Sequence, residues 1–263
     1  MRLLLTVRLI ALALFTTPVF AERIYFNGED WRGGFYDVPD DLAKDEKVWV
    51  VVDVHGANLL KGNKSTAELV KLLEPAKVII YIPSFKNGYQ SGSGKYAEKF
   101  IAEFGKIKEV YNVHDKMFIH GFSGGAQFVH RFAFNHPDYV IGVSAHSGGS
   151  WSTGSPWGEI NTKAKDIPFA ISCGKKDLKI THSQKGWTRL DWYKEFDKQM
   201  KQQEFVLGST AWNNFPHRPL LRRYGPLVRE CFFLATEGEI PESDYWTGDV
   251  EKVAKKAKNR AEK

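Results

Sequence analysis

The chain has little cysteine, and it lacks the cysteine and histidine patterns that are typical of metal centres. It has only two cysteines, Cys173 and Cys231, and they do not form a Cys-x-x-Cys pair. No two histidines at helical spacing accompany an acidic residue. These absences argue against a metal site, and we expect none. Whether the two cysteines form a disulfide or stay as two buried thiols is open at this stage, because spacing does not determine pairing.

Long apolar runs are also lacking. One run of note, residues 9–15, follows Arg2 and Arg8 and precedes small or branched residues that end at Ala21. It is shorter than the roughly 20 residues that a membrane-spanning helix needs. We interpret residues 1–21 as a secretory signal peptide, with a secreted or periplasmic mature chain and no stable membrane insertion after cleavage.

Composition indicates one domain and little affinity for nucleic acid. The residues from 22 to 263 suit a single α/β domain better than two domains. Formal net charge is +6, and much of the excess lies in a basic tail over about 250–263. We expect this tail to be a solvated helix end or a frayed terminus. No aromatic residues are interleaved with its lysines, so we expect no nucleic-acid partner, and the oligomeric state is open.

Apolar runs of strand length alternate with longer amphipathic stretches. This alternation predicts a mostly parallel sheet with helices on both faces and no large cap domain, with two antiparallel edge strands at 23–26 and 35–38. The predicted strands are 48–54, 78–82, 117–120, 140–145, 169–173 and 204–209. The predicted helices are 65–73, 96–111, 126–135, 187–202 and 220–235. A long loop is expected over 148–165.

One motif joins a predicted strand to a predicted helix. Ser123 lies in Gly121-Phe122-Ser123-Gly124-Gly125, directly after the strand and before the helix. In a nucleophile elbow the serine backbone is strained, and its neighbours two residues away must be small. Gly121 and Gly125 meet that requirement. The context therefore favours a nucleophilic serine over a tight structural turn.

A serine hydroxyl needs a base, and the base needs a carboxylate that fixes its tautomer. Asp177 follows the strand 169–173 through a short turn, and His217 follows the strand that starts at Glu204. Both residues would lie past the carboxyl ends of strands, in the order serine, acid, histidine. We predict that they complete a triad with Ser123.

Other residues compete for these roles. Asp177 could be an ordinary turn residue, and His217 an ordinary loop residue. His146 also follows a strand, and His182 follows Asp177 closely. We therefore treat His146 and His182 as rivals of His217 for the base.

Ester chemistry also needs donors for the oxyanion. The backbone N–H of Gly124 follows the nucleophile. The run that ends in His55-Gly56 closes a buried strand, and it predicts Ala57, with Gly56 next, as the source of the second donor.

Aromatic residues are frequent in the segments that should surround Ser123. We name five residues as tentative substrate contacts: His55, Tyr89, Trp151, Trp157 and Trp212. Packing of long loops onto the sheet is an equally good reading of each aromatic residue.

His55-Gly56, the Gly-x-Ser-x-Gly motif, Asp177 and His217, in this order, resemble the α/β-hydrolase superfamily. The exported single-domain organisation resembles secreted esterases of the polyhydroxybutyrate depolymerase and feruloyl esterase group. The resemblance implies a serine hydrolase that cleaves small-molecule or polymer-linked esters through an acyl-enzyme, without a cofactor. Two alternatives remain: a serine peptidase or acyltransferase on the same fold, and a non-catalytic binding protein.

Overall fold

A computed structural model describes residues 20–26, 33–56, 65–86, 88–182 and 185–261. Its strands form one sheet in the order β1-β2-β4-β3-β5-β6-β7-β8-β9. Strands β4, β3, β5, β6, β7 and β8 are parallel, and antiparallel strands flank them at both edges. The strands are β1 (Phe20–Phe26), β2 (Gly34–Pro39), β3 (Val48–Val54), β4 (Val78–Pro83), β5 (Val113–Phe122), β6 (Val140–His146), β7 (Phe169–Gly174), β8 (Leu207–Trp212) and β9 (Trp246–Thr247).

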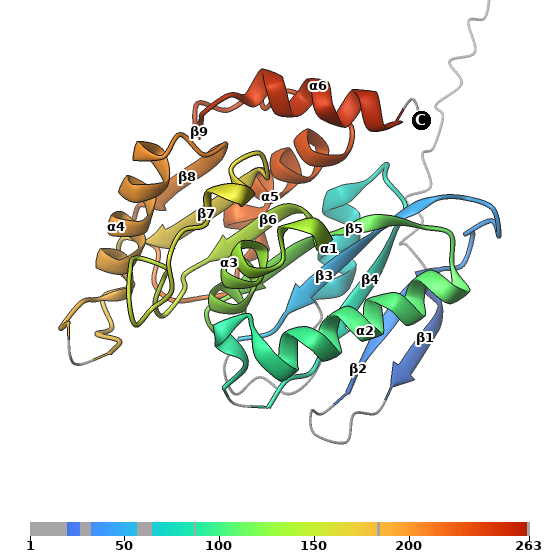
Figure 1. Ribbon diagram of the computed structural model, residues 1–263, viewed down its shortest axis with the longest axis horizontal. Helices are drawn as coiled ribbons and strands as arrows, with labels where there is room; N and C mark the ends of the chain where they lie inside the picture. Colours follow the sequence, from blue (N-terminus) through green and yellow to red (C-terminus); the bar gives the residue numbers. More distant parts are fainter. Residues whose placement is uncertain (1–19, 27–32, 57–64, 87, 183–184, 262–263) are drawn as a thin grey trace, which may run out of the picture.

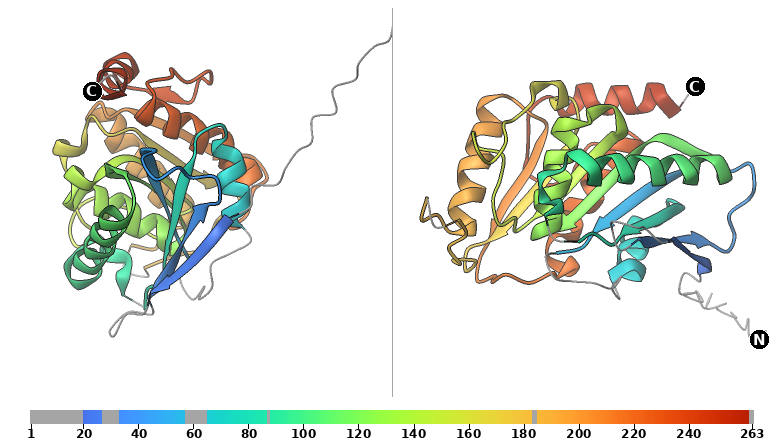
Figure 2. Two further views of the ribbon diagram at one scale, coloured as in Figure 1. Left: turned by 90° about the vertical axis from the view of Figure 1, so that its right-hand side faces the viewer. Right: turned by 60° about the horizontal axis from the view of Figure 1, so that its bottom comes forward.

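Helices cover both faces of this sheet (Figure 1). Helices α2, α3 and α4 pack on one face and α1 and α5 on the other, with α6 outside α5 (Figure 2). The predicted fold class is thereby confirmed. The helices are α1 (Ser65–Leu73), α2 (Gly94–Val110), α3 (Gly124–Asn135), α4 (Arg189–Gln202), α5 (Leu221–Thr236) and α6 (Val250–Ala261).

Alternation along the central strands sends side chains to two separate cores. In β3, Val50 and Val52 face α2 and α3, whereas Trp49 and Val51 face α1 and α5. A strand buried on both faces reads as a continuous apolar run, because successive side chains point to opposite sides. The run Val48–Val54 is therefore a strand in the middle of the sheet.

The two cysteines lie in different cores. Cys173 of β7 belongs to the core under α2, α3 and α4, and Cys231 of α5 belongs to the core on the other face. Both are free and buried. The sheet separates them, so the open question is answered in favour of two buried thiols.

Several boundaries differ from the predicted ones for local reasons. Helix α4 begins at Arg189 because the Thr188 hydroxyl accepts the N–H of Asp191, whose carboxylate accepts the N–H of Thr188. Strand β8 begins at Leu207, three residues later than expected, because α4 ends in a turn in which Glu204 has a positive φ of 55°. The predicted long loop over 148–165 joins β6 to β7 and ends in one short 3-10 turn.

The basic tail forms a helix, which is one of the two structures expected for it. Residues 250–261 form α6, and Val253, Ala254 and Ala257 are buried while the lysines of the helix are exposed. Apolar side chains at spacings of three and four residues give the helix one face that packs on α5. Of the two expectations, the segment matches the helix with a solvated face and not the frayed terminus.

The N-terminal prediction lies mostly outside the described residues. Strand β1 starts at Phe20, so the last two residues of the predicted signal peptide lie in an edge strand, and cleavage after Ala21 would leave β1 to begin at Glu22. In the described part of the chain, no helix is long and apolar enough to cross a membrane.

Candidate active site

The turn between β5 and α3 has the geometry of a nucleophile elbow. Ser123 adopts φ 58° and ψ −114°, a region that L-residues avoid. A Cβ on Gly121 would lie 2.5 Å from the carbonyl carbon of Gly125, and a Cβ on Gly125 would overlap the carbonyl oxygen of Val54. Both glycines of the motif are thus required by close backbone contacts, and the turn leaves the Ser123 side chain at the carboxyl edge of the sheet.

The three residues predicted to form a triad lie in one hydrogen-bonded chain. His217 Nε2 lies 3.0 Å from Ser123 Oγ, and His217 Nδ1 lies 2.7 Å from Asp177 Oδ2. A carboxylate only accepts, so Nδ1–H donates to Asp177 and Nε2 is free to accept the Ser123 hydroxyl proton. The Asp177 side chain is 1% exposed and that of His217 is 29% exposed, so the acid is buried and the base reaches the surface.

Contacts between two loops hold the acid and the base together. The N–H of Lys176 donates to the carbonyl of Phe215 at 3.0 Å, and the N–H of Asp177 donates to the carbonyl of Gly174 at 2.9 Å. A Cβ at position 174 would overlap the Phe215 carbonyl oxygen, so only glycine allows this approach. The loop after β7 and the loop after β8 are thereby fixed against each other.

A cation that the sequence analysis missed also contacts the acid. Arg189, the first residue of α4, donates from Nη1 to Asp177 Oδ1 at 3.2 Å. Its side chain is 12% exposed. One carboxylate oxygen is thus used by Arg189 and the other by His217. No local pattern points to this residue, because the contact depends on how α4 packs beside the end of β7.

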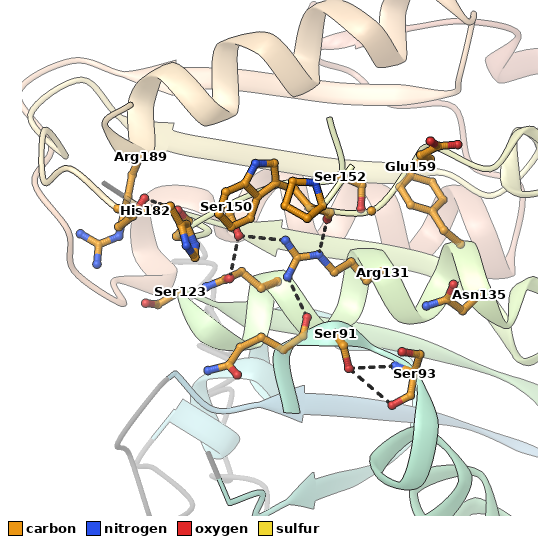
Figure 3. A pocket seen from close by; sticks show the side chains of 18 of the residues that line it. Ser91, Ser93, Ser123, Arg131, Asn135, Ser150, Ser152, Glu159, His182 and Arg189 are labelled. Carbon is orange, nitrogen blue, oxygen red and sulfur yellow. Dashed lines mark hydrogen bonds between the residues drawn. The ribbon is translucent and has the colours of Figure 1, made fainter. Parts of the chain in front are cut away.

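Neither rival histidine contacts the Ser123 hydroxyl, although His182 lines the same cleft as Ser123 (Figure 3). His146 is fully buried in β6, where its ring bonds the hydroxyls of Ser144 and Ser172. It meets the elbow only through its backbone, whose carbonyl accepts the N–H of Ser123. His182 packs against Trp157 with ring centroids 4.1 Å apart. In the structure, His217 rather than either rival lies against the Ser123 hydroxyl.

The predicted oxyanion donors are only partly described. Gly124 is the first residue of α3, where backbone N–H groups have no acceptor within the helix. Gly56 is buried after the end of β3. Ala57 lies outside the described residues.

Most of the tentative substrate contacts are packing residues. Trp151 is fully buried and stacks on Phe196 at 4.9 Å, and Tyr89 is 1% exposed and donates its hydroxyl to the His55 carbonyl at 2.6 Å. As substrate contacts, Trp151 and Tyr89 are therefore wrong. Trp212 packs against Tyr245 at the end of β8 and does not line the cleft at Ser123.

The His55 side chain connects the segment after β3 to the segment after β4 through hydrogen bonds. Its Nε2 accepts the N–H of Phe85 at 2.9 Å, which places the ring proton on Nδ1, 2.7 Å from the Gly56 carbonyl. The ring thus ties the segment after β3 to the segment after β4, and it does not lie among the residues that line the cleft. The prediction of a substrate contact is corrected to a structural role.

A polar cleft of about 830 Å³ opens at Ser123 and follows one face of α3. Residues spaced by four, Ser123, Gln127, Arg131 and Asn135, line its floor. Of the tentative contacts, Trp157 lines it. Figure 3 shows Ser123 near one end, Asn135 near the other and Arg131 between them. Helical spacing from Ser123 could have predicted this set of residues from the sequence.

Comparison with known proteins gives similarity in fold alone. No family model and no curated protein sequence matches the chain. Among solved structures, the ferulic acid esterase of the anaerobic fungus Anaeromyces mucronatus superposes with a TM-score of 0.60 at 16% identity, over 79% of this chain and 87% of that one. A poly(aspartic acid) hydrolase of Sphingomonas sp. KT-1 gives a TM-score of 0.56 at 17% identity, over 78% and 94%.

A thermostable esterase gives a TM-score of 0.55 at 16% identity, over 78% of this chain. The chain spans only 56% of the length of that esterase. These likenesses agree with the strand order, the elbow and the lack of a large cap among the described residues. The chain has the α/β-hydrolase fold, and the solved structures that it resembles include esterases and other serine hydrolases.

Proposed function

We propose that the protein is a serine hydrolase that cleaves carboxylic esters through an acyl-enzyme intermediate. The observation that carries the proposal is the chain of contacts from Ser123 through His217 to Asp177, at 3.0 and 2.7 Å, on a strained elbow. A serine on an elbow with a correctly oriented imidazole is an activated nucleophile. Neither a metal nor a cofactor takes part in this chemistry.

In the first half of the reaction, His217 Nε2 takes the proton of Ser123 while Oγ attacks the ester carbonyl. Asp177 stabilises the imidazolium that forms, because it is buried and accepts from Nδ1. The N–H of Gly124, with that of Ala57 or Gly56, would hold the oxyanion. His217 then protonates the leaving alcohol, and in the second half it activates water, which releases the acid and restores Ser123.

Labelling by a fluorophosphonate tests this proposal directly. The wild-type protein should be labelled and should hydrolyse 4-nitrophenyl esters of short acids, whereas Ser123→Ala should do neither. His217→Ala should be nearly inactive. Absence of labelling in folded wild-type protein would overturn the proposal and favour a binding protein. Retained activity in His217→Ala, with loss in a His146 or His182 variant, would overturn the assignment of the base.

Amide hydrolysis is a second candidate, because amide and ester substrates share one catalytic apparatus. The lining of the cleft is compatible with an amide substrate. Its amide, hydroxyl and charged side chains along α3 suit a polar substrate as well as an aryl ester. The solved neighbour described as a poly(aspartic acid) hydrolase has the same fold. Parallel assays with matched 4-nitrophenyl esters and 4-nitroanilides distinguish the two activities. Acyl transfer to an added alcohol would appear in the same ester assay as a second product.

The predicted signal peptide places this activity outside the cytoplasm, in the periplasm or the medium. N-terminal sequencing of the exported protein tests this part. A mature chain that begins near Glu22 is expected.

A further inference from the structure

Arg131 is a buried cation without a counter-ion. Its side chain leaves α3 about two helical turns after the elbow, and the residue is 8% exposed. Nε donates to the carbonyl of Trp157, Nη1 to that of Gln90 and Nη2 to the hydroxyl of Ser150, at 2.8–3.1 Å. All three acceptors are neutral. In the described part of the chain, no carboxylate lies within salt-bridge distance of this guanidinium.

Other buried charges in the protein have partners. Asp37, which is fully buried, is bridged by both nitrogens of the Arg23 fork at 2.7 Å, and Asp177 is bridged by Arg189. Taking a charge out of water costs free energy unless an opposite charge offsets it. Burial lowers the pKa of Arg131 to about 10, so the group is still a cation at neutral pH. Its position is therefore one where an incoming anion would be stabilised.

The surroundings of Arg131 strengthen this preference. Besides Arg131, the charged residues that line the cleft are Lys179, one carboxylate, Glu159, and Arg189, whose charge is already paired with Asp177. Glu159 lies with Asn135 toward the end of the cleft that is remote from Ser123 (Figure 3). Of the five N–H groups of Arg131, three donate to the protein, and the other two have no acceptor among the described residues. Arg189 Nε is also buried without a described partner.

The spacing along α3 sets the size of the ligand. Arg131 follows Ser123 by eight residues, which is roughly 12 Å along a helix at 1.5 Å per residue. Its side chain leans back toward Gln127, because Ser150 bonds both residues. The guanidinium is thus roughly one to two helical turns from the attacking hydroxyl, which is the reach of a medium-length chain.

We infer that the cleft selects esters that carry a second, ionised carboxylate, which binds to Arg131 while the ester carbonyl lies at Ser123. This inference rests on the proposed function and adds the substrate class. The carboxylate can lie on the acyl chain or on the alcohol, since the cleft contacts the elbow from one side only. Charge-assisted bonds to a buried guanidinium should raise kcat/KM by about 10- to 100-fold over a neutral analogue.

Two matched substrate series test the inference. The first compares mono-4-nitrophenyl esters of adipic, suberic and sebacic acid with their terminal carboxamides, which have the same length and no charge. The second compares acetate esters of ω-hydroxy acids with acetate esters of the corresponding ω-hydroxyamides. The measured quantity is the ratio of kcat/KM for acid over amide. One series should show a ratio of about 10 or more with an optimum chain length.

Two variants identify the cation. Arg131→Gln removes the charge, and Gln127→Glu keeps the side-chain shape and the bond from Ser150 while it neutralises the guanidinium from within the cleft. Both should lower the acid-to-amide ratio to about 1. Lys198→Gln, at an exposed position of α4, makes the same change in net charge and should leave the ratio as it is. Arg131→Gln loses three hydrogen bonds to loops and could fail to fold. In that case the acid-to-amide ratio of Gln127→Glu tests whether Arg131 binds the carboxylate.

A wild-type ratio of 1 or less in both series would overturn the inference, and so would a ratio that survives both variants. Failure of the proposed function is a separate result. If no ester is hydrolysed, calorimetric binding of suberate to the Ser123→Ala protein tests the anion site alone. Binding that disappears in Gln127→Glu would support the site, and no binding would overturn it.

Discussion

Asp177→Asn should disable the proposed triad through the orientation of one amide group. Asp177 accepts from His217 at Oδ2 and from Arg189 at Oδ1. Asparagine has one acceptor, and the positive guanidinium should attract it. The NH₂ group would then face His217 Nδ1, which must become an acceptor and carry its proton on Nε2 instead. In that tautomer His217 cannot take the proton of Ser123.

The expected loss follows from this tautomer. When the histidine of a triad is held in the wrong tautomer, kcat falls by about 10³- to 10⁴-fold, which corresponds to roughly 4–5.5 kcal/mol of transition-state stabilisation. Arg189 also makes a second prediction possible. In Asp177→Asn/Arg189→Met the amide is free to turn its oxygen toward His217, so the double variant should recover roughly tenfold relative to the single one.

The assay is kcat/KM for a neutral 4-nitrophenyl ester, with thermal unfolding of each variant as a measure of folding. Asp191→Asn is the matched control, because Asp191 caps the exposed start of α4 and lies outside the triad. It should lose some stability, about 1 kcal/mol, and retain its activity. An Asp177→Asn protein with more than a tenth of wild-type activity would refute the tautomer argument. A double variant no faster than the single one would refute the role given to Arg189.

Three further predictions concern the fold. Gly125→Ala should cost about 3 kcal/mol or more in thermal unfolding, because its Cβ overlaps the Val54 carbonyl, whereas Gly105→Ala in α2 meets nothing within 4 Å and should stabilise by about 0.5–1 kcal/mol. Equal effects would contradict the packing around the elbow. Cys173, whose pKa burial and Asp177 raise to about 12, should react with a thiol reagent only after unfolding, and reducing agent should leave the melting temperature unchanged. Burial lowers the pKa of His120, His130 and His146 below 6.5, so the unfolded chain binds protons that the folded one does not. Stability should therefore fall as pH drops below 6.5, with a limiting slope of about 1.4 kcal/mol per pH unit for each ring that is still neutral in the folded protein, and urea unfolding at about pH 7 and pH 5.5 measures this. Identical midpoints at the two pH values would show that these rings are not buried as neutral groups.

The sequence by itself determined the framework of the site. The strand before Ser123, the helix after it and the two glycines around it form a local pattern, and a local pattern is set by backbone sterics and side-chain periodicity. The alternation of apolar runs and amphipathic stretches likewise specified a mostly parallel sheet with helices on both faces. These features are visible in sequence because each depends on residues that are close in the chain.

The tertiary structure decided the features that depend on distant residues. Ser123 and His217 are 94 positions apart, and only the order of β5, β6, β7 and β8 in the sheet brings their loops together. Which histidine meets the serine was therefore open in the sequence. The same reason explains why the role of the aromatic residues near the site stayed open: composition cannot tell a cleft wall, where Trp157 lies, from the core behind it, where Trp151 lies.

Charge pairing is the clearest case of this division. The sequence lists arginines and carboxylates but does not say which of them meet, because ion pairs form wherever packing brings helices and loops together. In the folded protein Arg189 forms an ion pair with Asp177, whereas Arg131 donates hydrogen bonds to neutral acceptors. The nature of the reaction could thus be argued from one local motif, whereas the electrostatics of the cleft, and with it the proposed choice of substrate, arose only when the chain folded.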